Sequence, residues 1–519
     1  MTSSDPTIYS LLRDGAARWP DRVLVRLEDG EDWTWARALR EGARAADALG
    51  RRGVGRDDRV MLLLPNGATW LRAWWGATLL GAVVVPANPN LRGILLSDIC
   101  ELVDPAAIVA EEAEAQLLPG SHTGLRVTPA ELTAPDVDEI AELDPPPAPW
   151  DIHCMLMTSG TTGPSKASLT THAYVIGFLD WYLDDCGLGP GDVFQADMPW
   201  FHLSSFGPAV QMMRVGGTIA LRTKPAMTGY WTTAKELGST FAVLPGTVSQ
   251  FLAAQPPSAA DRDHSFRFVH CSPLPADPDG FIERFGLSGL VTAYGSSEAN
   301  LPVVAGLAVP QRAGTCGKVR DGFEVRIVDE HDREVPPGEV GELIARTDAP
   351  WLQTQGYFGR PEDTVRLLRN GWVHTGDAVR ADADGYLYFH DRYKDALRRR
   401  GENISSFEVE RAVAAHPAVV EVACVAHPDD YGSDDEVKVF LVAGGDLDFE
   451  ELLRFLADQM PRHMVPRYYE LIAELPKTPT ARVQKHLLRA KGNSAATWDR
   501  EAAGYRLTRD GLTRTPSPQ

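Results

Sequence analysis

The stretch Thr158-Ser159-Gly160-Thr161-Thr162-Gly163-Pro164-Ser165-Lys166 decides how the rest of the chain is interpreted. It follows a short apolar run at residues 154–157, which predicts a buried strand, and it precedes the apolar residues 174–179. We therefore expect a loop between a strand and a helix. Its two glycines and its hydroxyls allow N–H and O–H donors to converge on an anion, and Lys166 adds a mobile positive charge suited to phosphate. The spacing TSGTTGxxK differs from the Walker A pattern GxxxxGK[ST], and an ordinary polar turn would leave this run of donors unexplained.

The composition is that of a soluble globular protein. The chain has 519 residues, 44% hydrophobic and 24% charged, which is enough for about two or three domains with a large core. Its net charge of −20 argues against nucleic acid or an anionic membrane as a general partner. A polyanionic ligand must therefore be held by a local cluster of cationic side chains.

Cysteine usage and the apolar segments both predict a cytoplasmic protein. The six cysteines are scattered without a CxxC pair, which favours reduced thiols over a disulfide scaffold or a zinc site. The first residues lack a basic segment followed by an apolar core, so we expect no signal peptide. The most apolar stretch, residues 76–86, is too short to cross a bilayer.

The N-terminal part of the chain alternates strand and helix patterns. Residues 60–64 and 83–86 are continuous apolar strands, and residues 70–80 between them have helical character with three tryptophans that we assign to the core. Continuous apolar strands alternating with helices predict an α/β fold with largely parallel sheets.

Two further motifs lie downstream of the loop. Tyr294-Gly295-Ser296-Ser297-Glu298 offers a ring that can stack on adenine, a glycine that allows close backbone approach, and a carboxylate that is a hard ligand for Mg²⁺. Residues 371–377, GWVHTGD, end in Asp377, whose carboxylate can accept hydrogen bonds from both ribose hydroxyls. The alternative for Asp377 is a turn-forming role before Gly385.

A fourth segment, residues 390–410 (HDRYKDALRRRGENISSFEVE), completes a family resemblance. In this order the four motifs resemble those of the adenylate-forming superfamily of acyl-CoA synthetases, peptide-synthetase adenylation domains and luciferases. The resemblance is closest to the carnitine/crotonobetaine-type acyl-CoA ligases. Ser297 stands where the family usually has threonine, which keeps the hydroxyl.

The resemblance implies a two-domain architecture. We expect a large N-terminal domain, residues 1–392, of stacked and mostly parallel sheets with helices, and a small mobile α+β lid, residues 393–500. The lid would rotate about a hinge at Lys394. Residues 501–519 contain few apolar side chains, so we expect a disordered tail.

The resemblance also implies roles for individual residues. The phosphate loop would use Thr158, Ser159, Gly160, Thr161, Thr162, Gly163 and Lys166, and the nucleotide would further contact Tyr294, Gly295, Ser296, Ser297, Asp377 and Arg392. Thr161 and Glu298 would bind Mg²⁺, and Gly401 would line a tunnel for the thiol cofactor, coenzyme A.

Three residues are candidates for the substrate pocket. His202 lies among aromatic residues in the segment 198–207, MPWFHLSSFG, where a packed core histidine and a functional one are about equally expected. Its position resembles the family segment that gates the acyl pocket, so we assign it there. His270 and Cys271 lie in residues 268–274, a predicted strand running into a turn, where the family usually has small residues. They would narrow the pocket in favour of a compact or aromatic substrate, although simple packing of Cys271 is an equal alternative.

Two basic features remain open. Residues 398–400 are three consecutive arginines, which are either a solvated face or a site for the phosphates of coenzyme A. In the segment 475–485 the family has PKTxxGK, whereas this chain has Ala481 for the glycine and Arg482 for the catalytic lysine. Arginine keeps the charge but is bulkier and planar. Either Arg482 does the same work, or Lys485 reaches in, or the first half-reaction is altered.

The leading hypothesis is an ATP- and Mg²⁺-dependent ligase that joins a small or aromatic carboxylic acid to coenzyme A. The catalytic groups would be Lys166, Glu298, Arg482 and His202. The alternative is an ATP-dependent diazotase on the same fold, which activates nitrite and couples it to an aromatic amine. A third hypothesis is a catalytically silent nucleotide-binding homologue. No nucleic acid or membrane partner is expected, and the identity of the acid and the oligomeric state are left open.

Overall fold

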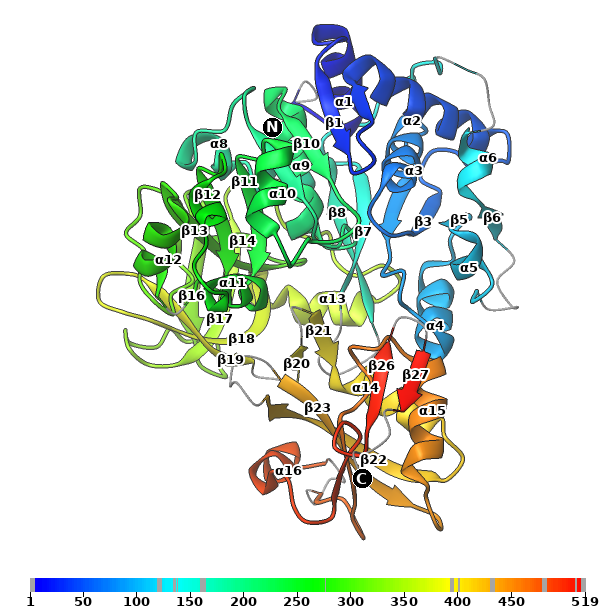
Figure 1. Cartoon of the computed structure of the whole chain (residues 1–519), viewed down its shortest axis with the longest axis vertical. Coiled ribbons are helices and arrows are strands. Elements are labelled where there is room, and N and C mark those ends of the chain that lie inside the picture. Colours follow the sequence, from blue (N-terminus) through cyan, green and yellow to red (C-terminus); the bar gives the residue numbers. More distant parts are fainter. Residues whose placement is uncertain are drawn as a thin grey trace.

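The computed structural model describes residues 5–118, 124–133, 137, 139–158, 165–275, 277–392, 396–399, 402–429, 435–477, 483–508 and 511–514. Figure 1 shows a large body of sheets and helices from the N-terminal part of the chain, with a smaller α+β part from the C-terminal residues below it. This arrangement confirms the predicted fold class.

One sheet of the large body carries the phosphate-loop strands at its edge. Its strand order is β6-β5-β3-β4-β7-β8, and β3 to β6 and β7 run parallel where they pair. The strands are β3 (Arg59–Leu63), β4 (Val83–Pro86), β5 (Ala107–Ala110), β6 (Leu125–Val127), β7 (Ile152–Thr158) and β8 (Lys166–Thr171). The continuous apolar runs are buried on both faces, as expected for parallel strands covered by helices.

The second sheet is larger. Its order is β15-β14-β13-β12-β11-β9-β10-β1-β2, with parallel pairing from β1 to β13 and antiparallel edges. The strands are β1 (Val23–Leu27), β2 (Asp32–Thr34), β9 (Val193–Ala196), β10 (Thr218–Leu221), β11 (Phe241–Pro245), β12 (Phe268–Ser272), β13 (Gly289–Ser296), β14 (Asn300–Ala305) and β15 (Lys318–Val319). Because parallel strands end together, the C-terminal residues of β11, β12 and β13 meet at one edge of this sheet.

Helices of the large body cover the two sheets. They are α1 (Ile8–Arg18), α2 (Trp35–Gly50), α3 (Ala68–Leu79), α4 (Gly93–Val103), α5 (Glu112–Ala115), α6 (Pro129–Thr133), α7 (His172–Gly177), α8 (Trp181–Asp185), α9 (Leu203–Val215), α10 (Tyr230–Leu237), α11 (Gly246–Ala254), α12 (Pro278–Phe285) and α13 (Pro361–Leu367), with single turns η1 (Ala259–Arg262) and η2 (Arg369–Gly371).

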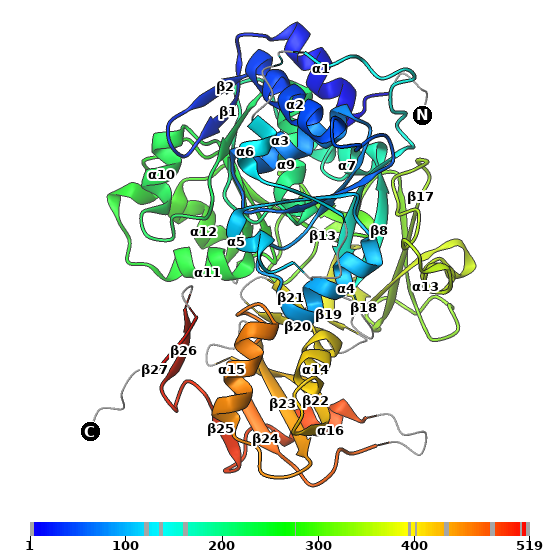
Figure 2. The ribbon, with the colours of Figure 1, turned by 90° about the vertical axis from the view of Figure 1, so that its right-hand side faces the viewer.

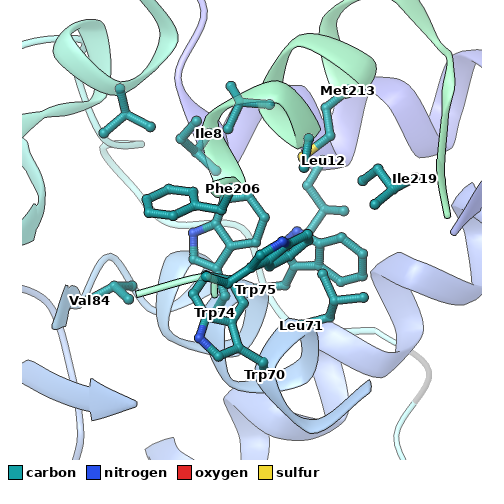
Figure 3. Packing of buried hydrophobic residues seen from close by; sticks show 14 of the residues in the cluster. Ile8, Leu12, Trp70, Leu71, Trp74, Trp75, Val84, Phe206, Met213 and Ile219 are labelled. Carbon is teal, nitrogen blue, oxygen red and sulfur yellow. The ribbon is translucent and has the colours of Figure 1, made fainter. Parts of the chain in front are cut away.

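The core prediction for the tryptophans of α3 is confirmed. Trp70, Trp74 and Trp75 are at most 1% exposed and pack among Phe206 of α9 and aliphatic side chains of neighbouring helices and strands (Figure 3). Gly76 allows α2 to lie close, since an added Cβ would come within 2.7 Å of the Ala45 Cβ. Truncating a buried tryptophan to alanine typically costs about 3–5 kcal/mol, so these side chains stabilise the helix layer strongly.

A third sheet, which is antiparallel, lies beside strands β14 and β15 of the second sheet. Its order is β16-β17-β18-β19, formed by β16 (Phe323–Val328), β17 (Gly341–Thr347), β18 (Val373–Ala381) and β19 (Leu387–Arg392). It brings Asp377 beside β13, which carries Tyr294.

The C-terminal part begins with a hairpin and continues as a small mixed sheet. The hairpin is β20 (Ala396–Arg399) and β21 (Glu402–Ser405), and the sheet has the order β22-β23-β24-β25. Its elements are α14 (Ser406–Ala414), β22 (Val419–Pro428), β23 (Asp435–Ala443), α15 (Phe449–Gln459), β24 (Tyr468–Leu471), α16 (Lys485–Lys491) and β25 (Thr497–Asp499).

The expectation of a disordered tail from residue 501 is wrong for its described part. β26 (Tyr505–Thr508) and β27 (Gly511–Arg514) form an antiparallel hairpin. Tyr505 is 3% exposed and packs into the apolar core of the C-terminal part, with Leu507 and Leu512 beside it. These few apolar side chains suffice because they bury against an existing core. Residues 515–519 lie outside the described residues.

The C-terminal part docks on α4 of the large body. Leu95 of α4 is buried within the core cluster of the C-terminal part, and Arg411 of α14 pairs with Asp98 at 2.5 Å. Figure 2 shows α4 directly above α14 and α15.

Among the described residues, no helix combines the length and apolar character needed to cross a lipid bilayer.

Candidate active site

The phosphate loop closes a hairpin. Thr158 pairs with Lys166 at the end of the antiparallel β7–β8 ladder, so Lys166 begins a strand and the helix follows only after β8. This corrects the expected strand–loop–helix order, because residues 166–171 pair with β7 as a strand before the helix begins. The loop residues Ser159, Gly160, Thr161, Thr162 and Gly163 lie outside the described residues.

Lys166 and Glu298 both contact Tyr357, the first at its ring face and the second at its hydroxyl. The Lys166 ammonium lies 4.8 Å from the centre of the Tyr357 ring, and the Tyr357 hydroxyl donates to Glu298 Oε1 at 2.8 Å. The same ammonium is 3.4 Å from Asp363 Oδ1. The predicted phosphate-binding and metal-binding side chains are therefore neighbours, although they are far apart in the sequence. Tyr357 was not among the predicted site residues.

Tyr294 and Asp377 also come together. The Tyr294 hydroxyl donates to Asp377 Oδ2 at 2.7 Å, and burial with the adjacent carboxylate raises the pKa of Tyr294. Asp377 is 5% exposed. Arg392 pairs with Asp377 through the backbone of β19 and β18. An aromatic ring beside a carboxylate is an arrangement that can hold the base and the ribose of a nucleotide.

Residues 295–297, which precede Glu298, make contacts that hold the backbone in place. A Cβ on Gly295 would lie 1.8 Å from the Asn300 carbonyl oxygen, so the glycine is required by the turn between β13 and β14 rather than by a nucleotide. Ser296 accepts from the Glu298 amide at 3.2 Å, and the carbonyl of Ser297 accepts from Ser168 at 2.8 Å. These bonds fix the backbone from which the Glu298 side chain projects.

A carboxylate that sequence reasoning missed supports Asp377. Glu342 Oε1 accepts from the Gly376 amide at 3.0 Å, and its Oε2 lies 3.1 Å from His374 Nδ1. Burial acts to raise the pKa of Glu342, but the hydrogen bond to His374 and the bond from Gly376 lower it. Glu342 thus holds His374 and Gly376, two of the three residues that precede Asp377, where the β17–β18 register shifts.

His202 contacts the C-terminal hairpin. Its Nε2 lies 3.1 Å from Glu402 Oε2, and its side chain is 43% exposed. Burial acts to raise the pKa of Glu402, but the hydrogen bond and charge of His202 lower it. The segment predicted to gate the acyl pocket therefore faces the segment predicted to contain the tunnel for the thiol. Gly401 lies outside the described residues.

The sequence matches a known protein family over most of its length. A family model described as AMP-binding enzyme matches residues 12–358, and one described as AMP-binding enzyme C-terminal domain matches residues 408–482. The chain belongs to the AMP-binding enzyme family. Among curated relatives, the crotonobetaine/carnitine–CoA ligase of Salmonella arizonae is 30% identical over 507 residues, covering 92% of this chain and 97% of the ligase.

Solved structures of AMP-binding enzymes agree in fold. A double mutant of o-succinylbenzoate CoA synthetase (MenE) from Bacillus subtilis, bound to its product analogue OSB-NCoA, has a TM-score of 0.83 and 22% identity, covering 93% of this chain and 98% of its own. The amide bond synthetase McbA from Marinactinospora thermotolerans has a TM-score of 0.80 and 25% identity, covering 94% and 99%. This AMP-binding enzyme is an ATP-dependent, AMP-forming ligase of the acid–CoA ligase family, as predicted.

The pocket residues of this AMP-binding enzyme divide between two faces of β12. His270 packs against Trp181 and Tyr182 and lies 3.1 Å from Ser272 Oγ, and burial lowers its pKa to about 4, so the ring is neutral near pH 7. Cys271 is fully buried in the separate core under α10 to α12. The idea that Cys271 narrows the pocket is wrong, because successive strand residues point to opposite faces.

The arginine run does not act as one cationic patch. Arg399 is 2% exposed, donates to the carbonyls of His463 and Val465 at 3.0 and 3.2 Å, and pairs with Glu436 at 2.6 Å. Its guanidinium is engaged inside the C-terminal part, which corrects its proposed use for coenzyme A phosphates. The side chains of Arg398 and Arg400 lie outside the described residues.

The segment that departs from the family motif is described only at its ends. Ala481 and Arg482 lie outside the described residues. Lys485 donates to Ser406 Oγ at 2.7 Å and pairs with Glu410 at 2.8 Å, both on α14. In this arrangement of the domains the Lys485 ammonium is held within the C-terminal part, which disfavours it as the replacement for the family lysine.

The donor set fits a metal that is shared with a nucleotide. Within the described part of the chain, no three His, Cys, Asp or Glu side chains are grouped as a metal cage. Glu298 offers a carboxylate next to the Lys166 ammonium, and Mg²⁺ is commonly held by one or two carboxylates together with substrate phosphates. None of the six cysteines, all of which lie in described segments, forms a disulfide.

Proposed function

We propose that this enzyme uses ATP and Mg²⁺ to activate a small or aromatic carboxylic acid and then transfers the acyl group to coenzyme A. In the first half-reaction the carboxylate oxygen attacks the α-phosphorus, the bond to the β-phosphate oxygen breaks, and pyrophosphate leaves. In the second, the thiol sulfur attacks the acyl carbon, its proton is released, and AMP leaves. The observation that carries the proposal is that Lys166 and Glu298 share contacts with Tyr357, while Tyr294, four residues before Glu298, bonds Asp377.

The first half-reaction would depend on positioning and charge neutralisation. Tyr294 and Asp377 would hold adenosine, and Lys166 would neutralise phosphate charge. When bound by Glu298 and the phosphates, Mg²⁺ would supply further charge neutralisation. The activated species is the mixed anhydride itself, so no nucleophilic side chain is required.

The contact between His202 and Glu402 supports a second half-reaction between the domains. A carboxylate that bonds one nitrogen of an imidazole fixes its tautomer and orientation. The His202 ring is then suited to accept the proton that the thiol releases. The similarity to a CoA synthetase bound to its product analogue adds support.

A compact substrate is favoured by the position of His270. The His270 ring packs with Trp181 and Tyr182 in the protein interior below Ser272. Ser272 ends β12 and bonds the Ala293 carbonyl, next to Tyr294. Long acyl chains would have to displace this packed cluster. A flat aromatic acid or a short acid would not.

A second candidate is the diazotase, with nitrite as the activated oxyanion and an aromatic amine as acceptor. The residue at position 482, an arginine in place of the family lysine, favours it because the lysine contacts the attacking carboxylate in the family. The likeness to McbA, named as an amide bond synthetase, makes an amine a further plausible acceptor in place of the thiol.

One panel of reactions tests both candidates. The enzyme is incubated with ATP, Mg²⁺ and short or aryl acids, with and without coenzyme A, and in parallel with nitrite and amino-aryl acids; mass spectrometry detects all products. We expect AMP and an acyl-CoA from at least one compact acid, and their loss in Lys166→Ala. A diazo product formed only with nitrite, or an amide formed in preference to the thioester, would overturn the proposal.

A further inference from the structure

We propose that Tyr357 is the residue that positions Lys166 and Glu298 relative to each other for one Mg²⁺-bound ATP, its hydroxyl fixing the carboxylate and its ring seating the ammonium. This inference rests on the proposed roles of Lys166 and Glu298. It assigns a function to a segment, residues 354–358, that no motif pointed to.

The backbone places Tyr357 beside Lys166. Residues 355–358 run antiparallel to β8: the Gln355 amide donates to Leu169, and the Phe358 amide to Ala167, both at 2.9 Å. Tyr357 lies opposite Ser168, two residues from Lys166. Side chains at positions i and i+2 of a strand share a face, and so do directly opposite residues. Lys166 and Tyr357 are therefore on the same face of this ladder.

The segment is held rigidly at both ends. The Thr354 amide donates to the Glu298 carbonyl at 3.1 Å, and the Tyr357 amide donates to Thr364 Oγ1 at 2.9 Å. Gly356 has φ +103°, and a Cβ there would lie 2.4 Å from Thr364 Cγ2, so glycine is required before Tyr357. These contacts fix the backbone from which the Tyr357 ring projects.

The hydroxyl and the ring face of Tyr357 make different interactions, which substitutions can remove separately. The hydroxyl donates to Glu298 Oε1 at 2.8 Å, which orients the carboxylate and leaves Oε2 to face a metal. Burial and the adjacent carboxylate raise the pKa of Tyr357, so the hydroxyl remains a donor. The ring face lies 4.8 Å from the Lys166 ammonium, within the range of a cation–π interaction.

Asp363 sets the strength of the phosphate interaction. Its Oδ1 is 3.4 Å from Lys166 Nζ, so a phosphate approaching the ammonium competes with an anion already beside it. Tyr357 and Asp363 thus act on the same ammonium in different ways: the ring fixes its place, and the carboxylate moderates its attraction for phosphate.

Calorimetric titration with ATP, in excess Mg²⁺ or in EDTA, separates these contributions without any acid substrate. Tyr357→Phe should weaken binding in Mg²⁺ about tenfold, the size of one hydrogen bond to a charged acceptor, and leave binding in EDTA within about twofold. Tyr357→Leu should weaken ATP binding both in Mg²⁺ and in EDTA. The loss that it causes beyond that of Tyr357→Phe should disappear when Lys166→Ala is also present. Asp363→Asn should tighten binding in EDTA severalfold.

Tyr386 provides a matched control. It is 2% exposed, has the Lys318 ammonium 4.5 Å from its ring centre, and donates its hydroxyl to the Pro310 carbonyl at 2.9 Å. Tyr386→Phe should change neither titration. Unchanged Mg²⁺-dependent binding in folded Tyr357→Phe, or an equal loss in Tyr386→Phe, would overturn the inference. If the wild-type enzyme binds ATP as expected but forms no acyl-CoA, the proposed function fails while this test remains valid.

Discussion

At the scale of single residues, we propose that Asp377 holds the ribose of the nucleotide. The Asp377 carboxylate accepts a hydrogen bond from Tyr294. The substitution Asp377→Asn would replace this carboxylate with a neutral amide of the same shape. We expect the dissociation constant of ATP to rise about tenfold, with the melting temperature little changed. Calorimetry with ATP and with 2′- and 3′-deoxyATP checks this: the variant should lose the preference for ATP. An undiminished preference would contradict the ribose role.

Glu408 gives a pH dependence of known sign. Its half-buried carboxyl accepts from Ser165 of the phosphate loop, and loss of solvent with the nearby Asp98 raises its pKa from 4.5 to about 7. The folded state holds a proton that the unfolded chain releases in this window, so the free energy of unfolding contributed by Glu408 falls as pH rises from 4.5 through 7.

The test is the melting temperature at pH 5 to 8. Glu408→Gln mimics the protonated group, so its melting temperature should decline less over this range than that of the wild type. Glu362→Gln, at an exposed carboxylate paired with Arg366, serves as the control and should follow the wild type. Parallel curves for the wild type and Glu408→Gln would show that the group titrates normally.

At the scale of elements, Glu342 of β17 positions Asp377 on β18 by holding His374 and Gly376, which lie just before it. Glu342→Ala would leave the Gly376 amide and His374 without this partner, at a cost of about 1–3 kcal/mol. We expect a lower melting temperature and weaker ATP binding. Glu342→Gln, which keeps an acceptor for the Gly376 amide, should recover part of both.

The same sheet contains a control for this element. Glu324 of β16 pairs with Arg346 at 2.5 Å on the exposed face, where an ion pair contributes about 0–1 kcal/mol. Glu324→Ala should therefore change neither the melting temperature nor ATP binding appreciably. Equal effects at Glu324 and Glu342 would argue against a specific hold on Asp377.

At the scale of the whole molecule, the C-terminal part is held on α4 by apolar packing and by the pair Arg411–Asp98. Arg411→Glu should slow acyl-CoA formation from the adenylate severalfold, because it opposes this domain arrangement, while pyrophosphate release stays near the wild-type rate. Adding Asp98→Arg should restore the second step. Rapid-quench assays of both half-reactions measure this, and a loss in the first step alone would contradict it.

The sequence predicted those candidate site residues whose chemistry is carried by a local motif, such as Lys166, Glu298 and Asp377. It did not locate Tyr357, Glu342 or Glu402, because each acts through a partner distant in the chain. Tyr357 lies 59 residues from Glu298, Gly376 lies 34 from Glu342, and His202 lies 200 from Glu402. A residue of this kind has no motif of its own, since its neighbours are set by how strands and domains meet.

The sequence by itself determined the family, the α/β class and the tryptophan core, because motif order and hydrophobic periodicity are local properties of the chain. Only the tertiary structure decided which way side chains face. His270 and Cys271 separate to two cores, Arg399 is buried against Glu436, and the tail folds back through Tyr505. Strand pleating and burial against an existing core govern these outcomes, and both depend on neighbours that are brought close only by folding.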